Sequence, residues 1–181
     1  MKPSRPSPAS SNSMVTKNDF SPADWSTLRN TQLLVGFATV MAGSSGLGTV
    51  KEVFALSQGI MESQASDIPL IRDLTNKSEM EAAQTSLKQS LGGVQAKAAG
   101  DDLRKRALEQ VRSSIACLET HASKEETDAY RRMLYGIAEK VANAAREGGF
   151  LGFGGTQISE GERSFLEELR NTLQLEQVKR A

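Results

Sequence analysis

The sequence predicts an all-α protein, a single bundle of about six helices with a disordered N-terminal tail. Apolar residues recur three and four positions apart through most of the chain, which is the spacing of one helix face. No segment alternates apolar and polar residues as a half-buried strand does. No proline occurs from Leu70 to Ala181, so nothing there interrupts a helical hydrogen-bond ladder. The 181 residues are enough for one domain with a core of its own.

Residues 1–18 differ from the rest of the chain in composition. They contain three of the five prolines, five serines and no acidic residue. Such a stretch buries too little apolar surface to order itself. We therefore expect a disordered tail over 1–18 and a helical bundle domain over 19–181. A serine-rich, acid-free start is also typical of a transit peptide, and Met14 could be a second start site, so both alternatives stay open.

The first predicted helix begins with Ser21 as N-cap and Pro22 at the first helical position. It continues into a stretch from Asn30 to Val50 that carries no charge, and its centre, LLVGFATVMA, is apolar on all sides. Such a helix is expected inside a bundle. The strongly apolar part is about ten residues long, whereas a membrane span needs about 20. Contact with a membrane surface stays an alternative.

Glycines and serines at 43–48 predict a turn, and three helical segments follow it. The glycine spacing resembles a phosphate-binding loop, but Thr49 stands where that motif needs lysine, and the chain offers no sheet to carry it. Pro69 opens a short helix, and Ser78 with Glu81 forms a capping box for the next one. The expected apolar stripes of the two longer segments are Val50, Val53, Phe54, Ser57, Ile60 and Met61, and then Met80, Ala83, Leu87, Leu91 and Val94.

Three strongly amphipathic helices complete the predicted bundle. The first spans 101–121, the second spans 123–147, and the third starts at Ser159. Capping boxes formed by Ser123 with Glu126 and by Ser159 with Glu162 mark the starts of the last two. The apolar stripes are Leu103, Ala107, Val111, Ile115 and Leu118; Tyr130, Leu134, Ile137, Val141 and Ala145; and Phe165, Leu166, Leu169 and Leu173.

The charge balance and the rare residues exclude several functions. Lys and Arg total 22, and so do Asp and Glu, which leaves no basic excess for a nucleic-acid partner. Cys117 is the sole cysteine and His121 the sole histidine, so we expect no disulfide and no multi-ligand zinc site. We also expect no cofactor, no bound metal and no catalytic residue. Two acidic clusters lie among basic residues, as on a solvated helix face; they are Glu125, Glu126 and Asp128, and Glu160, Glu162, Glu167 and Glu168.

The segment GGFLGFGG at 148–155 is the most distinctive part of the sequence. Five glycines surround Phe150, Leu151 and Phe153. Glycine leaves the backbone permissive, and large apolar side chains on such a loop either pack into the bundle or contact a partner. Phe150, Leu151 and Phe153 are therefore our candidate partner contact. The alternative, that the phenylalanines close the end of the core, stays open.

Two segments carry a resemblance to known proteins. KVANAAREGGFLGFGGTQISEGERSFLEEL, together with DWSTLRNTQLLVGFATVMA, is similar to an uncharacterised bacterial family of all-helical proteins over most of residues 20–175. A more distant likeness is to the TerB-like helical domains of tellurite resistance, which share a helix, a glycine-containing loop and an acid-capped helix. The resemblance implies an all-helical fold and a bacterial source. The loop acids that are thought to serve metal binding in TerB-like domains are absent from 148–158 here.

Together these features predict a non-enzymatic helical module that binds another protein or a second copy of itself. The sequence does not identify that partner, and we expect a cytoplasmic location. Two alternatives stay open. One is a peripheral membrane or stress-response protein of the TerB-like kind, and the other is an enzyme with a carboxylate site inside the bundle. A buried cluster of two or more acids would favour the enzyme.

Overall fold

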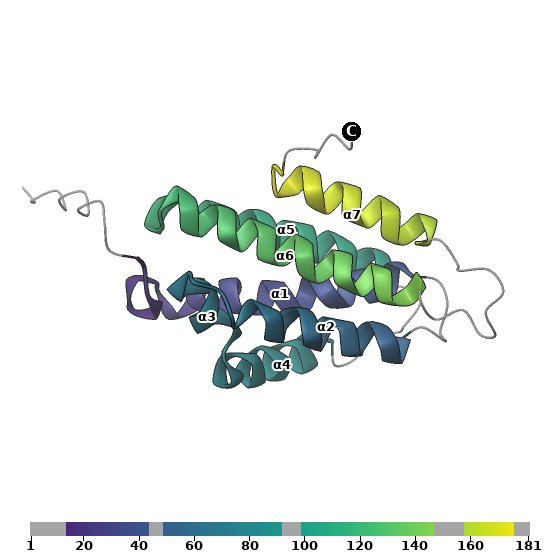
Figure 1. The fold of residues 1–181 in the computed structure, drawn as a ribbon, viewed down its shortest axis with the longest axis horizontal. Helices are drawn as coiled ribbons and strands as arrows, with labels where there is room; N and C mark the ends of the chain where they lie inside the picture. The colour runs from purple at the N-terminus through teal and green to yellow at the C-terminus, as the bar shows by residue number, and fades with distance from the viewer. Residues whose placement is uncertain (1–13, 44–48, 92–98, 147–157, 176–181) are drawn as a thin grey trace, which may run out of the picture.

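The computed structural model describes residues 14–43, 49–91, 99–146 and 158–175. Within these ranges the chain forms α-helices and one short 3-10 helix, with no strand, so the predicted all-α fold is confirmed. Seven α-helices take the place of the six or so expected (Figure 1). In chain order the elements are η1 (Lys17–Asp19), α1 (Pro22–Ala42), α2 (Thr49–Ser63), α3 (Pro69–Thr75), α4 (Lys77–Leu91), α5 (Ala99–His121), α6 (Lys124–Arg146) and α7 (Glu160–Thr172).

Helix α1 is the centre of the bundle and contacts each of the other six α-helices. In Figure 1 it lies between α5, α6 and α7 on one side and α2, α3 and α4 on the other. Its uncharged stretch is buried, as the sequence predicted, and six consecutive residues, 31–36, belong to the buried part. The buried amide of Gln32 is satisfied at one end, where its Nε2 donates to the carbonyl of Leu74 at 2.8 Å.

Helix starts follow the predicted caps with one exception. The Ser21 side chain accepts from the Asp24 N–H, and the boxes of Ser123 and Ser159 both form. The prediction that Ser78 caps α4 is wrong. The helix begins at Lys77, two residues earlier than a Ser78 cap would allow, and the Asn76 side chain accepts from the Glu79 N–H at 3.0 Å. Asparagine is among the strongest N-caps, so it takes this role.

The N-terminal segment is ordered further upstream than we expected. The Val15 N–H donates to Glu126 Oε1 at 2.7 Å, and Lys17 pairs with Glu79. The Phe20 ring is buried and lies 5.8 Å from the Trp25 ring. Residues 14–18, which we placed in the tail, therefore pack against the bundle. The first 13 residues lie outside the described part of the chain.

Helix α2 differs most from its predicted orientation. The apolar stripe was expected to turn Val53, Phe54 and Met61 inward, but all three are exposed. The buried face instead carries a glutamate among small and aliphatic residues: Glu52, Ala55, Leu56, Gly59 and Ile60. Leu56 packs so closely on α1 that a methyl group at Gly36 would lie 2.2 Å from its Cδ1. The apolar residues of α2 go almost all the way round, so their spacing alone does not select the buried face.

Candidate functional site

The predicted partner-contact residues Phe150, Leu151 and Phe153 lie outside the described residues. The sole cysteine and the sole histidine lie one turn apart on α5, with Cys117 Sγ 3.9 Å from His121 Nδ1. His121 is exposed, and its Nδ1 lies 2.9 Å from the carbonyl oxygen of Cys117, as at a helix end. Burial, and next the nearby Asp24 carboxylate, raise the pKa of the Cys117 thiol, which keeps it protonated and unreactive.

Four buried glutamates are the most unusual polar feature of the described residues. They are Glu52, Glu79, Glu126 and Glu162, and each lies in the first turn of its helix. The expectation of solvated acidic faces is therefore wrong for Glu126 and Glu162. Both belong to the predicted capping boxes, where the side chain folds back onto the chain and is covered by the neighbouring helices. That capping position is the signal in the sequence that could have identified them.

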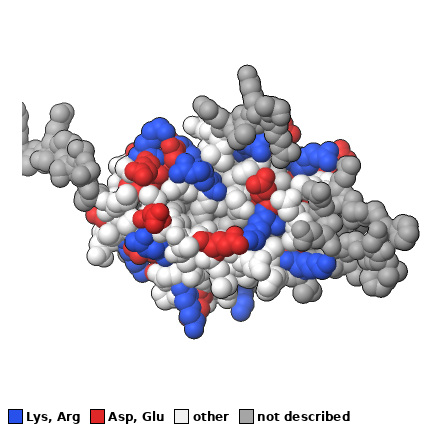
Figure 2. Space-filling model, in the orientation of Figure 1, with Lys and Arg blue, Asp and Glu red and all other residues white. Residues whose placement is uncertain are grey.

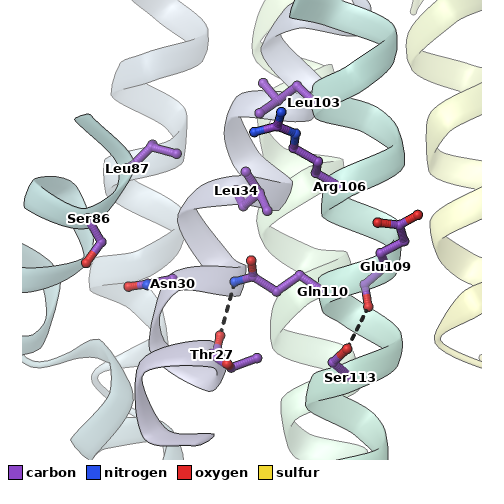
Figure 3. Close-up of a pocket in the computed structure, with 10 residues that line it drawn as sticks. All are labelled: Thr27, Asn30, Leu34, Ser86, Leu87, Leu103, Arg106, Glu109, Gln110 and Ser113. Atoms are coloured by element: carbon purple, nitrogen blue, oxygen red, sulfur yellow. Dashed lines mark hydrogen bonds between the residues drawn. The ribbon is translucent and has the colours of Figure 1, made fainter. Parts of the chain in front are cut away.

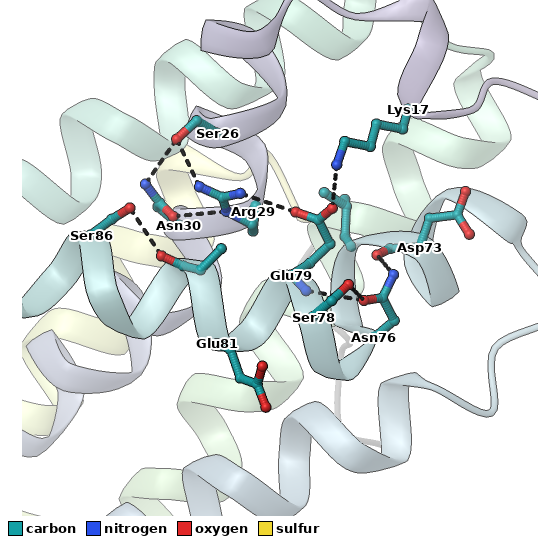
Figure 4. Close-up of polar contacts among 12 residues, drawn as sticks. Lys17, Ser26, Arg29, Asn30, Asp73, Asn76, Ser78, Glu79, Glu81 and Ser86 are labelled. Carbon is teal, nitrogen blue, oxygen red and sulfur yellow. Dashed lines mark hydrogen bonds and ion pairs between the residues drawn. The ribbon is translucent and has the colours of Figure 1, made fainter.

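Glu79 is a buried carboxylate with two cationic partners (Figure 4). Its Oε1 accepts from Lys17 Nζ at 2.6 Å, and its Oε2 accepts from Arg29 Nη1 at 3.1 Å. Burial alone would raise the pKa of this carboxyl, but the hydrogen bonds from Lys17 and Arg29 lower it below the ordinary value. The cluster joins η1, α1 and α4, and its geometry is that of a structural tie.

Glu126 is also fully engaged. Its Oε2 accepts from the backbone N–H of Ser123 at 2.9 Å and from the Ser123 hydroxyl at 2.7 Å. Its Oε1 accepts from the Val15 N–H. The carboxylate thus caps α6 and holds the N-terminal segment at the same time, and both of its oxygens have partners within the chain.

Glu162 and Glu52 form the contrasting case. Glu162 is 1% exposed, and its Oε2 accepts from the Ser159 N–H at 2.8 Å. Its Oε1 is buried and has no hydrogen-bond partner. Glu52 is 2% exposed, and burial, and then repulsion from Glu162, raise the pKa of its carboxyl to about 7. Among the described residues no Lys or Arg forms an ion pair with either carboxylate.

A groove of about 430 Å³ lies between α1, α4 and α5 (Figure 3). Its floor is aliphatic, with Leu34, Leu87 and Leu103. The polar groups on its rim are largely engaged within the chain. Gln110 Nε2 donates to the carbonyl of Thr27 at 3.3 Å, and Arg106 pairs with Asp102 one turn away on α5. Because these groups already have partners, the groove offers little that is prepared for a ligand.

The outward face of α2 carries exposed apolar side chains. Phe54 is 63% exposed and Met61 is 66% exposed, and Val53 lies beside them at 37%. Ser57 and Gln58 between them are uncharged, and the exposed Lys51 and Glu62 border the face at its two ends. Elsewhere on the side shown in Figure 2, Lys and Arg are interspersed with Asp and Glu, with no block of one sign.

No protein-family profile, curated protein or solved structure matches this chain. In the described ranges no helix is long and apolar enough to cross a membrane. The same ranges hold no group of three or more His, Cys, Asp and Glu side chains placed to bind a metal ion. Two features of the described residues are candidates for a site: the outward face of α2 and the buried glutamates Glu52 and Glu162.

Proposed function

We propose that the protein is a helical interaction module that binds a second copy of itself through the outward face of α2. The observation that supports this most strongly is the exposure of Phe54 and Met61 on one helix. They are seven residues apart, which is two turns and about 10 Å, so they lie on the same face. A single exposed apolar residue is ordinary, but a large aromatic and a methionine in one row mark an interaction surface.

The spacing of these residues is suited to a symmetric contact. In an antiparallel α2–α2 pair centred between Ser57 and Gln58, Phe54 of one copy packs against Met61 of the other. Two-fold symmetry repeats the same contact on the far side of the axis. Ser57 is small and its hydroxyl is already bonded to the carbonyl of Val53, so it permits the close approach of two helices. Methionine adapts its shape to an aromatic ring and is common at such surfaces.

The overall charge also supports self-association. The chain has a formal net charge of zero at pH 7, so two copies do not repel each other over long distances. The candidate contact at Phe150, Leu151 and Phe153 stays a separate prediction for a protein partner.

Sedimentation velocity of the full chain over the micromolar range tests this proposal. We expect a monomer–dimer equilibrium in the wild type, and we expect Phe54→Ser to weaken it at least tenfold. Lys88→Ser, at an exposed position of α4, is the matched control and should associate as the wild type does. A wild type that stays monomeric throughout the range, or a Phe54→Ser chain that dimerises normally, would overturn the proposal.

A flotation assay with vesicles that contain anionic lipid separates self-association from the membrane alternative. An exposed Phe and Met could also insert into a bilayer surface. We expect the protein to stay out of the lipid fraction. Flotation of the wild type that is lost in Phe54→Ser would replace the dimer with a membrane contact.

One observation favours a second candidate, an enzyme that uses carboxylates. Burial and the neighbouring Glu162 carboxylate raise the pKa of Glu52 to about 7, which suits a group that exchanges protons near neutral pH. The groove between α1, α4 and α5 reaches neither carboxylate, however. A substrate would need another way in, so we retain the interaction module as the proposed function.

A further inference from the structure

A hollow of about 270 Å³ lies between α2 and α6, beside the outward face of α2. One glycine from each helix lines it. A methyl group built on Gly136 of α6 would meet no atom within 4 Å, so the space around this residue is open. A methyl group on Gly59 of α2 would lie 3.5 Å from the Cα of Ile137, because the two helices approach closely there. The lack of a side chain at Gly136 therefore keeps the hollow open.

The hollow combines buried apolar residues with charged groups at its rim. Met133 and Ile137 of α6 line it, and both are buried. At the rim Lys140 pairs with Glu62 of α2. Arg132 is exposed, and among the described residues no carboxylate forms an ion pair with it. An aliphatic surface beside a guanidinium suits an aromatic ring, which buries apolar area against the first and attracts the second with its face.

The hollow lies at the level of α2 where the second copy is expected to make its contact. The lining residues from α2 are Gly59, Glu62 and Ser63, which flank Met61 in the sequence. In the antiparallel pair proposed above, Phe54 of the second copy lies opposite Met61. Its ring is 63% exposed in the monomer, so it has a large apolar area to bury. The ring therefore arrives next to a space that no side chain of the receiving chain fills.

We propose that Phe54 of a second copy inserts its ring into the hollow between α2 and α6, against Met133 and Ile137 and beside Arg132. This inference rests on the proposed self-association and deepens it, because it assigns the receiving half of the contact to α6. Each copy then supplies one ring and one hollow. Two-fold symmetry uses both pairs at once, so the dimer is closed and a third copy finds no site. The surface therefore selects a partner that carries both a ring and a hollow of its own.

Filling the hollow tests the proposal, with sedimentation velocity of the full chain as the measurement. Gly136→Gln places a large polar side chain in the open space and should weaken dimerisation at least tenfold. Gly136→Ala adds only a methyl group and is the matched control, which should dimerise as the wild type does. Both replacements favour the helix over glycine, so both chains should melt no lower than the wild type. A Gly136→Gln chain that dimerises as Gly136→Ala does would overturn this inference and leave the α2 contact standing, whereas a monomeric wild type would overturn both.

Arg132 gives an independent test at the rim of the hollow. Arg132→Gln removes the cation but keeps a long polar side chain, and it should weaken dimerisation about two- to fivefold, as the loss of an exposed cation–π contact does. Arg112→Gln, at an exposed position of α5, changes the net charge by the same amount and is the control. If Gly136→Gln does not fold, these two variants decide. Weaker dimerisation of Arg132→Gln alone supports the hollow as the receiving site, and equal dimerisation of the two variants contradicts it.

Discussion

Helices α2 and α4 are of the same length, 15 residues, and each carries one buried glutamate in its first turn. Their surroundings are opposite. Glu79 of α4 meets two cations, whereas Glu52 of α2 meets another carboxylate. Outward, α4 presents polar residues and α2 presents Phe54 and Met61.

The contrast lies in where the side chains of each helix find their partners. The buried glutamate of α4 has its cationic partners within the chain, as expected of a helix that stabilises the fold. Helix α2 differs on both sides, because its buried glutamate interacts with another carboxylate instead of a cation and its outward face carries exposed apolar side chains. Departures from local consistency of this kind concentrate at functional sites, which is why the proposed contact is placed on α2.

The largest expected effect on stability comes from removing a cationic partner of the buried Glu79. Arg29→Met leaves the buried Glu79 carboxylate with Lys17 alone and should cost about 3 kcal/mol of unfolding free energy. Urea unfolding near pH 7 measures it. Because the folded-state pKa of Glu79 is lowered, its contribution is present above the ordinary pKa and is lost as pH falls through the lowered value. The cost of Arg29→Met should therefore shrink in acid. A cost that is equal at all pH values would show that Arg29 acts by packing alone.

The contribution of Glu52 to stability should have the opposite dependence on pH. The folded-state pKa of Glu52 is raised to about 7, so its protonated form stabilises the fold below the ordinary pKa, and this contribution is lost as pH rises to about 7. Glu52→Gln, which is uncharged at every pH, should be more stable than the wild type at about pH 8, by roughly 1–3 kcal/mol. The two should converge near the ordinary pKa. Unfolding in chelator-containing buffer measures both, and a less stable variant at the higher pH would contradict this account of the pair.

A smaller effect sharpens the comparison within the Glu79 cluster. Lys17 is more than half exposed, whereas Arg29 is largely buried. Exposed ion pairs contribute little, so Lys17→Met should cost less than about 1 kcal/mol. The same unfolding assay as for Arg29→Met applies. Equal costs for the two variants would mean that the N-terminal segment, and not the buried pair, dominates the cluster.

The smallest effect on stability is expected on the outward face of α2. Phe54 is 63% exposed in the monomer, so its side chain contributes little to packing. Phe54→Ser should therefore change the free energy of unfolding of the monomer by no more than about 0.5 kcal/mol. Unfolding at a protein concentration well below that of dimer formation measures the stability of the monomer alone. A large loss would show that Phe54 is structural and would remove the main support for the interaction surface.

The sequence predicted the fold well because helix periodicity and caps are local signals. The uncharged stretch of α1 and the boxes of Ser123 and Ser159 were all read correctly. Two features could not be predicted from the sequence. The apolar residues of α2 surround the helix, so only its packing on α1 and α6 shows which are left outside. The electrostatic interaction of Glu52 with Glu162, more than a hundred residues away in the sequence, depends on the tertiary fold and is encoded by no local pattern.

The central claim, that α2 is the contact surface of a symmetric pair, is tested most directly by cross-linking at the two-fold axis. Ser57→Cys in a Cys117→Ser chain places one thiol beside the expected axis, where two copies bring it within disulfide range. Thr85→Cys on the exposed face of α4 is the matched control. We predict that mild oxidation converts the Ser57→Cys chain to a covalent dimer, that the Thr85→Cys chain stays monomeric, and that added Phe54→Ser suppresses the dimer. Equal cross-linking at both positions, or none at Ser57→Cys, would contradict the claim.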